Sequence, residues 1–373
     1  MTKPRIVALA GATATSVAAL GIGLGASLCV VALSGASPGA ALSSLFRGAF
    51  GSEDAVLSTT VQMLPLILVA LAWIVALSGG LFNVGMIGQM ILGGVGAATV
   101  ALEIPLPSGL HLAGAVIGGA VAGMLWAGLS TLLWVWRGVN EIISTLLLNF
   151  VAIQVLAWLL RGPLQEPGSP FFQTAPLPDS ATWPSLAPRA GLGADVFLVA
   201  ALVVLVAVVL RGTTFGLRLR LTAANEQAAQ KAGISTRTVR VGAMLWSGSL
   251  AGVAGSSLVL SGQLHVLTDG FQGMYGLDGI AVALLARNSA LATVPAALLF
   301  AGLIQGGGVM EAEVGVPSSL VSITAGIVIV AVAASTVFAR LGRVRFLREL
   351  RRRRGDRQVR ADASVVPRVE AGD

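Results

Sequence analysis

Residues 213–235 read Thr213-Thr-Phe-Gly-Leu-Arg-Leu-Arg-Leu-Thr-Ala-Ala-Asn-Glu-Gln-Ala-Ala-Gln-Lys-Ala-Gly-Ile-Ser235. This is the one long polar and cationic interruption in an otherwise apolar sequence, and it separates apolar stretches at 195–211 and 241–261. Thr222 can cap a helix, the residues that follow as far as Ala232 favour helix, and Gly233 supplies a left-handed exit. We therefore predict a short, rigid helix from Thr222 to Gly233 at one membrane surface.

The composition is that of a membrane protein. Of the 373 residues, 55% are hydrophobic and 11% are charged, and the mean hydropathy is +0.86. Soluble domains carry about 25% charged residues. Only helices or closed barrels satisfy their backbone in lipid, and the apolar runs here are too long and too continuous for barrel strands. The predicted fold class is an all-α, polytopic transmembrane helix bundle.

Ten candidate spans follow from the apolar runs. They lie near 6–34, 61–79, 84–101, 110–134, 141–160, 195–211, 241–261, 273–287, 291–310 and 319–339. The two short runs at 84–101 and 273–287 fit either re-entrant or broken spans. The stretch at 6–34, which follows Lys3 and Arg5, also fits a cleaved signal peptide.

Charge assigns the loops to the two sides of the membrane. Basic residues gather at the N-terminus, in the loop 212–240 and after Arg340, and cytoplasmic segments are enriched in Lys and Arg. We therefore place both termini in the cytoplasm. Residues 1–339 form one transmembrane domain, in which 212–240 is a cytoplasmic loop, and 340–373 form a basic, disordered cytoplasmic tail.

The external loop is predicted at 161–194. This segment holds seven of the fifteen prolines of the chain. It is either a stiff connection between two helices or a docking surface for an external partner.

Several function classes lack their usual residues. The chain has one cysteine and two histidines, and no spacing of them suggests a metal site or a catalytic group. No P-loop sequence is present, so the chain itself has no such ATP site and needs no cofactor of its own. Eleven of the 24 basic residues lie beyond residue 339, which fits the cytoplasmic bias rather than binding to nucleic acid. Few ionisable residues lie within spans, which disfavours an ion-coupled secondary transporter.

Polar side chains nevertheless interrupt the spans, and they are the candidates for a substrate pathway: Asn83, Gln89, Asn140, Glu141, Ser144, Asn149 and Asp278. On a helix, Glu141, Ser144, Thr145 and Asn149 share one face. Such residues either line a pathway or form hydrogen bonds between helices. For Asp278, an ion pair with Arg287 is the alternative.

Glycines recur at the spacing that allows helix backbones to approach closely. The pairs are Gly114/Gly118, Gly119/Gly123, Gly248/Gly252 and Gly302/Gly306. This spacing predicts a compact bundle and carries no information about a substrate.

Five elements, taken in order, resemble the permease subunits of ATP-binding-cassette importers. They are Asn83–Met90, Asn140–Asn149, Phe215–Ile234, Ser247–Gly255 and Gly276–Leu285. The resemblance extends from about residue 60 to 335. It is to the group that contains ribose and branched-chain amino acid permeases, and most of all to its nucleoside-type branch. That family commonly has Gly-Glu-Asn-Pro where this chain has Ala223-Ala-Asn-Glu226.

The resemblance implies a division of labour between subunits. Separate ATPase subunits would bind ATP, a second homologous permease would complete a heterodimer, and an external lipoprotein would deliver a nucleoside-like solute. It implies a multi-pass protein of a bacterial cell membrane that works by alternating access. A ribose-type sugar permease is the alternative. The residues expected to couple the chain to its ATPase are Arg218, Arg220, Thr222, Glu226, Ala228, Ala229 and Gly233.

Overall fold

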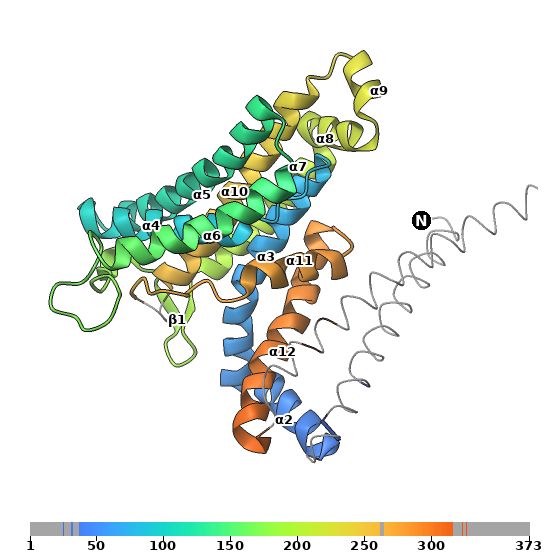
Figure 1. Cartoon of the computed structure of the whole chain (residues 1–373). Coiled ribbons are helices and arrows are strands. Elements are labelled where there is room, and N and C mark those ends of the chain that lie inside the picture. Colours follow the sequence, from blue (N-terminus) through green and yellow to red (C-terminus); the bar gives the residue numbers. More distant parts are fainter. Residues whose placement is uncertain are drawn as a thin grey trace, which may run out of the picture. The chain divides into compact units, whose positions relative to one another are not determined.

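The structure is a computed structural model that describes residues 37–261 and 265–315, and five single positions outside them (25, 31, 32, 323 and 326). The long helices are α3 (Glu53–Ser78), α4 (Met86–Glu103), α5 (Leu110–Arg137), α6 (Glu141–Leu160), α7 (Asp195–Gly212), α10 (Thr236–Leu260) and α12 (Thr293–Val314). The shorter ones are α2 (Pro38–Phe50), α8 (Thr214–Ala224), α9 (Glu226–Lys231), α11 (Tyr275–Leu285), η1 (Asp179–Ala181) and η2 (Ala290–Ala292). A small antiparallel pair joins β1 (Ser185–Ala187) to β2 (Leu192–Gly193). Figure 1 shows these elements.

Within the described residues, seven helices are long and apolar enough to cross a membrane. They are α3, α4, α5, α6, α7, α10 and the run of η2 with α12, and each coincides with a predicted span. At 84–101, where the sequence suggested a re-entrant or broken span, the structure has one uninterrupted helix, α4, of 18 residues. At 273–287 the helix α11 is only 11 residues long, so it is too short to cross a membrane by itself, as expected of a re-entrant or broken span. The predicted spans 6–34 and 319–339 and the tail 340–373 lie outside the described residues.

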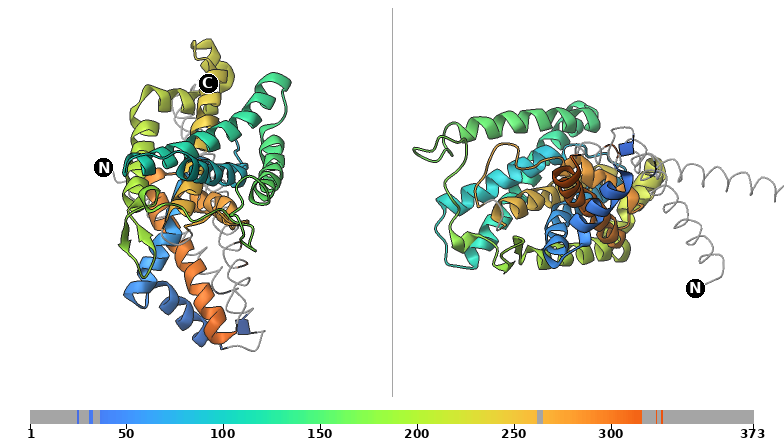
Figure 2. Two further views of the ribbon diagram at one scale, coloured as in Figure 1. Left: turned by 90° about the vertical axis from the view of Figure 1, so that its left-hand side faces the viewer. Right: turned by 90° about the horizontal axis from the view of Figure 1, so that it is seen from below.

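One helix, α2, was not predicted. Ser37 caps it by accepting a hydrogen bond from the Ala40 amide at 3.4 Å, and Pro38 occupies its first turn. Both are favoured at a helix start. The helix packs along α12 and α3, as Figure 2 shows from two further sides.

The middle of the bundle is formed by α3 and α10. In their most apolar windows, 72% of the α3 residues and 78% of the α10 residues are buried, against 22% for α5. A helix that is apolar all round needs neighbours on every side, and α3 is uniformly apolar from Leu64 to Ala76. The helices α5, α6 and α7 expose large apolar side chains on one side, which suits lipid.

The helices α4, α5 and α10 meet backbone to backbone through five glycines, which we name the glycine seam: Gly93, Gly119, Gly123, Gly248 and Gly252. A methyl group on Gly252 would lie 2.3 Å from the carbonyl oxygen of Gly119, and one on Gly93 would lie 2.4 Å from the Gly252 Cα. The close approach predicted for the pairs Gly119/Gly123 and Gly248/Gly252 is confirmed. Such contact is typical of small-residue interfaces in membranes.

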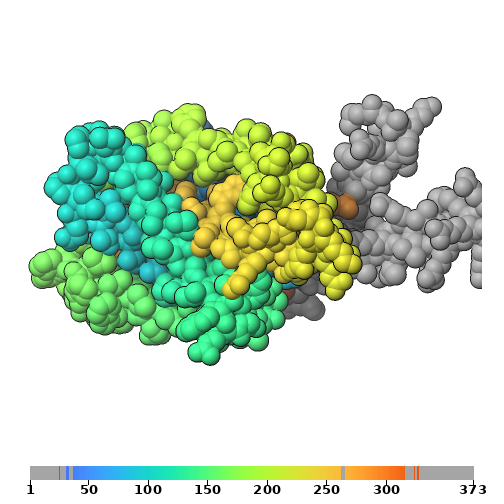
Figure 3. Space-filling view, turned by 90° about the horizontal axis from the view of Figure 1, so that it is seen from above, coloured from blue at the N-terminus to red at the C-terminus, as the bar shows by residue number. Residues whose placement is uncertain are grey.

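One end of the bundle, formed by residues 212–240, we name the α8–α9 end. Here the Arg240 Nε donates to the carbonyl oxygen of Gly79 just after α3, at 3.4 Å. The Arg237 guanidinium donates to the Val135 carbonyl of α5 at 2.6 Å. Figure 3 shows α8, α9 and the start of α10, coloured yellow-green to yellow, beside the end of α5. Helices α3 and α5 therefore end here and α10 begins here.

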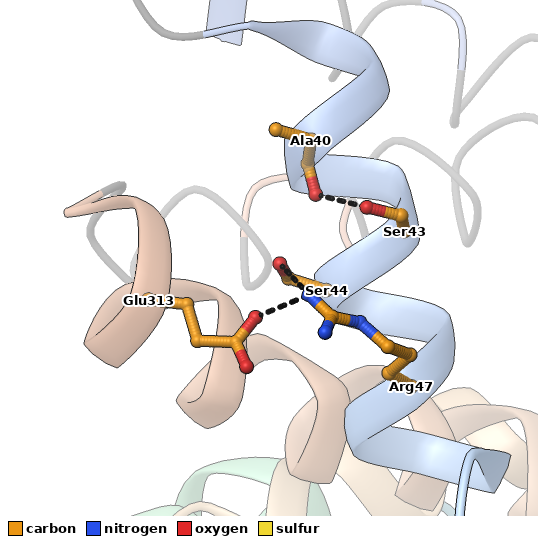
Figure 4. Close-up of polar contacts among 5 residues, drawn as sticks. All are labelled: Ala40, Ser43, Ser44, Arg47 and Glu313. Carbon is orange, nitrogen blue, oxygen red and sulfur yellow. Dashed lines mark hydrogen bonds and ion pairs between the residues drawn. The ribbon is translucent and has the colours of Figure 1, made fainter.

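The opposite end contains the loop 161–194, and we name it the loop end. The Trp183 amide donates to the Leu260 carbonyl at the end of α10, at 3.0 Å. On the far side of α3, Arg47 of α2 forms an ion pair of 2.8 Å with Glu313 at the end of α12 (Figure 4). The loops 161–194 and 212–240 thus lie at opposite ends of α7.

Candidate functional site

The α8–α9 end contains two helices rather than one. Helix α8 is capped by Thr213, whose hydroxyl accepts from the Gly216 amide at 3.3 Å. The chain is extended at Asn225, with φ −160°, and the Asn225 side chain caps α9 by accepting from the Ala228 amide at 3.0 Å. The predicted helix start at Thr222 is therefore wrong. Thr222 lies buried in the last turn of α8, and Asn225, a more favoured cap than threonine, begins α9. The predicted left-handed exit at Gly233 is confirmed, with φ +80°.

Helix α9 is anchored on its inner side. Glu226 forms an ion pair with Arg240 at 2.9 Å and accepts from the Thr236 hydroxyl at 3.3 Å. The Gln230 amide donates to Thr236 at 3.1 Å, and Ala229 is buried against this group. Because Arg240 also donates to Gly79, α9 is joined both to the start of α10 and to the end of α3.

The outer side of the same helices is open. Its exposed polar residues include Arg218, Arg220, Gln227 and Lys231, and Ala228 is exposed between them. Two leucines of α8, Leu217 and Leu221, are also exposed, at 49% and 44%. They were missed in the sequence, although their spacing of four residues places them on one helix face. The α8–α9 end therefore presents a mixed apolar and cationic surface that lacks a described partner within this chain.

A second polar cluster lies inside the bundle. Asn83 is fully buried, and its amide nitrogen donates to Gln89 and to Ser247 of α10, each at 2.8 Å. The Gln89 amide donates back to the Asn83 oxygen at 3.0 Å, and the Ser247 hydroxyl donates to the Ala72 carbonyl of α3 at 2.7 Å. The cluster therefore ties α3, α4 and α10 together at the turn between α3 and α4.

Helix α6 adds two polar side chains to this cluster. Asn149 accepts from the Gly88 amide at 2.8 Å and donates to the Val84 carbonyl at 2.9 Å. The Thr145 hydroxyl is 3.4 Å from the Val84 amide. Both side chains and Ser144 are buried, so the predicted polar face of α6 does turn inward. The predicted pathway residues Asn83, Gln89 and Asn149 are thus brought together.

The other predicted pathway residues lie apart. Asn140 caps α6 by accepting from the Ile142 amide at 2.8 Å, and Glu141 is half-buried in the first turn of that helix. Asp278 is half-buried on α11. Neither an ion pair nor a hydrogen bond joins it to Arg287 in the part of the chain that the structure describes. Arg287 instead has left-handed backbone (φ +53°) in the turn that ends α11.

Replacing Asn149 by leucine tests what the buried cluster does. Leucine leaves the Gly88 amide and the Val84 carbonyl without partners, which costs about 1–3 kcal/mol for each buried group. We expect the thermal unfolding midpoint of the purified chain to fall. Gln154→Leu, on an exposed position of the same helix, serves as the control and should leave the midpoint unchanged. Equal midpoints for wild type and Asn149→Leu would show that the cluster does not stabilise the fold.

The loop 161–194 is ordered by a second segment at the loop end. The Thr174 amide donates to the Leu267 carbonyl at 3.1 Å, and the Leu267 amide donates to the Thr174 hydroxyl at 3.0 Å. The Leu177 amide donates to the His265 carbonyl at 2.8 Å, while the His265 side chain is exposed. The two segments thus form a joint surface at the loop end, which is the opposite end of the bundle from α8 and α9.

Comparison with known proteins identifies the family. Residues 55–333 match the family described as branched-chain amino acid transport system / permease component. The glucose ABC transporter permease protein TsgB13 of Haloferax volcanii is 35% identical over 91% of this chain and 90% of its own length. The guanosine ABC transporter permease protein NupP of Bacillus subtilis is 35% identical over 84% of this chain and 91% of its own.

A third relative is more distant. The nucleoside ABC transporter permease protein NupB of Lactococcus lactis subsp. cremoris is 29% identical over 79% of this chain and 83% of its own length. These matches cover most of the spanning helices described above, so the chain is a multi-pass membrane protein. It belongs to the family of permease components of branched-chain amino acid transport systems.

Proposed function

We propose that this chain is the permease subunit of an ATP-binding-cassette importer that carries a nucleoside-like solute into a bacterial cell by alternating access. The observation that carries the proposal is the two-sided character of α9. Its inner side is held by Arg240 at the junction of α10 and α3, and its outer side is exposed. A partner protein that displaces this helix would thereby displace the centre of the bundle as well.

An ion pair and several hydrogen bonds connect α9 to the spanning helices. Displacement of α9 acts on Glu226 and hence on Arg240, which is 19% exposed and contacts both α10 and the end of α3. Helix α10 carries Ser247, which is hydrogen-bonded to Asn83 in the α3–α4 turn. ATP-driven closure of the partner ATPase would thereby tilt spans and change which side of the membrane is open.

The residues of the coupling surface divide into two groups. Arg218, Arg220 and Ala228 are exposed and would contact the ATPase, together with Leu217 and Leu221. Thr222 and Ala229 are buried and would support the surface from within, while Glu226 anchors it and Gly233 ends α9. The partner groove should therefore be apolar with acidic groups at its rim.

For the solute pathway, the contacts favour different roles for the candidates. The amides of Asn83, Gln89 and Asn149 are hydrogen-bonded by protein groups, so we assign them to shaping the α3–α4 turn. Glu141 and Asp278 are only half-buried and stay available to face a pathway between this chain and a second, homologous permease. The external lipoprotein would dock on the joint surface of the loop end.

The solute proposal rests on two relatives. The names of NupP and NupB state guanosine and nucleoside transport, whereas that of TsgB13 states glucose transport. The test is uptake of radiolabelled guanosine and glucose in cells that lack this chain, with and without a plasmid copy. We expect the copy to restore guanosine uptake and to fail when the partner ATPase is inactive. Restoration of glucose uptake alone would favour the sugar permease, and uptake without ATPase activity would overturn the ATP-driven mechanism.

A further inference from the structure

A buried carboxylate at the loop end has no part in the proposed coupling. Asp195, the first residue of α7, is 2% exposed. Its Oδ2 accepts a hydrogen bond from the hydroxyl of Ser257 on α10. Its Oδ1 is buried without a hydrogen-bond partner, and over residues 37–261 and 265–315 no basic side chain forms an ion pair with it. A buried charge in this position needs compensation.

This carboxylate lines a small cavity, which we name the Asp195 pocket. Its walls include Asp195, Ser257, Ser261 and Tyr275, with Gly193 of β2 above and Pro65 of α3 beside them. The cavity offers about 30 Å³ to the centre of a water-sized sphere. A single water needs roughly 10–15 Å³ by the same measure. The pocket therefore accommodates an ion or about two waters, and a sugar or nucleoside is too large for it.

A proline of helix α3 also lies at this pocket. Pro65 has no N–H, so it cannot form the helical hydrogen bond to the carbonyl of Val61, four residues earlier. Val61 and Pro65 both line the Asp195 pocket. The pocket therefore lies beside a turn of α3 that lacks one helical hydrogen bond.

The chemistry of the lining favours a cation. The polar side chains of the lining are the Asp195 carboxylate and the hydroxyls of Ser257, Ser261 and Tyr275. The Tyr275 hydroxyl donates to the Gln62 side chain, which leaves the Tyr275 oxygen free to accept. Hard cations prefer such oxygen ligands, and divalent sites commonly supply more than one carboxylate. A single carboxylate therefore suits a single positive charge.

We propose that the Asp195 pocket binds a monovalent cation of the size of sodium. The ion would connect α3, α7, α10 and the start of α11 at the loop end and would compensate the Asp195 charge. The site depends neither on the ATPase nor on the solute, so the test of the site and the test of the transport proposal can fail independently.

The test uses the purified full chain in lipid nanodiscs. The thermal unfolding midpoint is measured while sodium chloride replaces choline chloride at constant ionic strength. A ligand that binds only the folded state stabilises it by RT ln(1 + L/Kd), where L is the ligand concentration, so the midpoint rises with the logarithm of that concentration once it exceeds Kd. For the wild type we expect a rise of several degrees that follows the logarithm of the sodium concentration. We expect no dependence on sodium for Asp195→Asn, and an unchanged response for Asp179→Asn, which alters an exposed acid of the same loop end.

A second variant guards against misfolding of Asp195→Asn. Ser261→Ala keeps the carboxylate and removes one hydroxyl, so the rise of the midpoint should begin at a higher sodium concentration and then follow the same logarithmic slope. A wild-type midpoint that is indifferent to sodium would show that the pocket holds only water beside a helix N-terminus, which itself favours an acid. A full sodium response in Asp195→Asn would likewise overturn the site.

Discussion

Replacing Gly123 by alanine is expected to destabilise the chain by about 1–3 kcal/mol, the usual cost of overpacking. The added methyl group would lie 2.5 Å from the Gly248 carbonyl oxygen and 2.6 Å from the Gly252 Cα. Both are backbone atoms, so no side chain can rotate away and the helices α5 and α10 must separate. The measurement is the denaturant or thermal unfolding of the purified chain.

The same helix offers a matched control. A methyl group on Gly128, five residues further along α5, would meet only the tip of Leu245, at 3.5 Å. Alanine in a helix is otherwise better than glycine by about 0.5–1 kcal/mol. Gly128→Ala should therefore leave stability unchanged or raise it. If both variants behave alike, close backbone contact at the glycine seam is not what holds α5 against α10.

Replacing Arg240 by methionine is expected to reduce solute uptake by about tenfold, a common size for coupling between sites. Methionine removes the ion pair to Glu226 and the hydrogen bond to Gly79, and so separates α9 from both α10 and α3. The exposed face of α8 and α9 is unchanged. ATP hydrolysis and co-purification with the ATPase should therefore persist while uptake falls.

Two comparisons make this prediction specific. Arg237→Met changes an arginine of the same helix that contacts α5 through Val135, and it should retain uptake. Glu226→Gln should reproduce the loss, and the double variant with Arg240→Met should be little worse than either single variant, as expected for partners in one interaction. Loss of ATPase binding in Arg240→Met would assign Arg240 to docking instead.

The seven described spans were predictable because a long apolar run marks a helix that is buried in lipid or protein, whichever its neighbours are. The division of the α8–α9 end into two helices was not predictable in this way. Thr222 and Asn225 are both good helix caps, and the choice between them depends on contacts of α9 with Arg240 and Thr236, which follow later in the chain. Helix α2 was missed because a short helix beside α12 lacks the length that marks a span.

The candidate site shows the same limit. The spacing of Ser144 and Asn149 correctly predicted one buried face of α6. It did not show whether that face lines a pathway or holds a neighbour, because the partners of Asn149 are Val84, in the turn before α4, and Gly88, in α4 itself. The Asp195 pocket could not be predicted from the sequence for a related reason: the polar side chains that line it come from separate helices.

The glycine seam also constrains how the protein can change shape. Where backbones touch, no layer of side chains exists that could adopt new rotamers, and sliding one helix along another would force each glycine past a bulkier neighbour. Helices α4, α5 and α10 are therefore expected to travel as a single block during transport. Hinge motion would then fall outside this block, where it meets its neighbours α3 and α6.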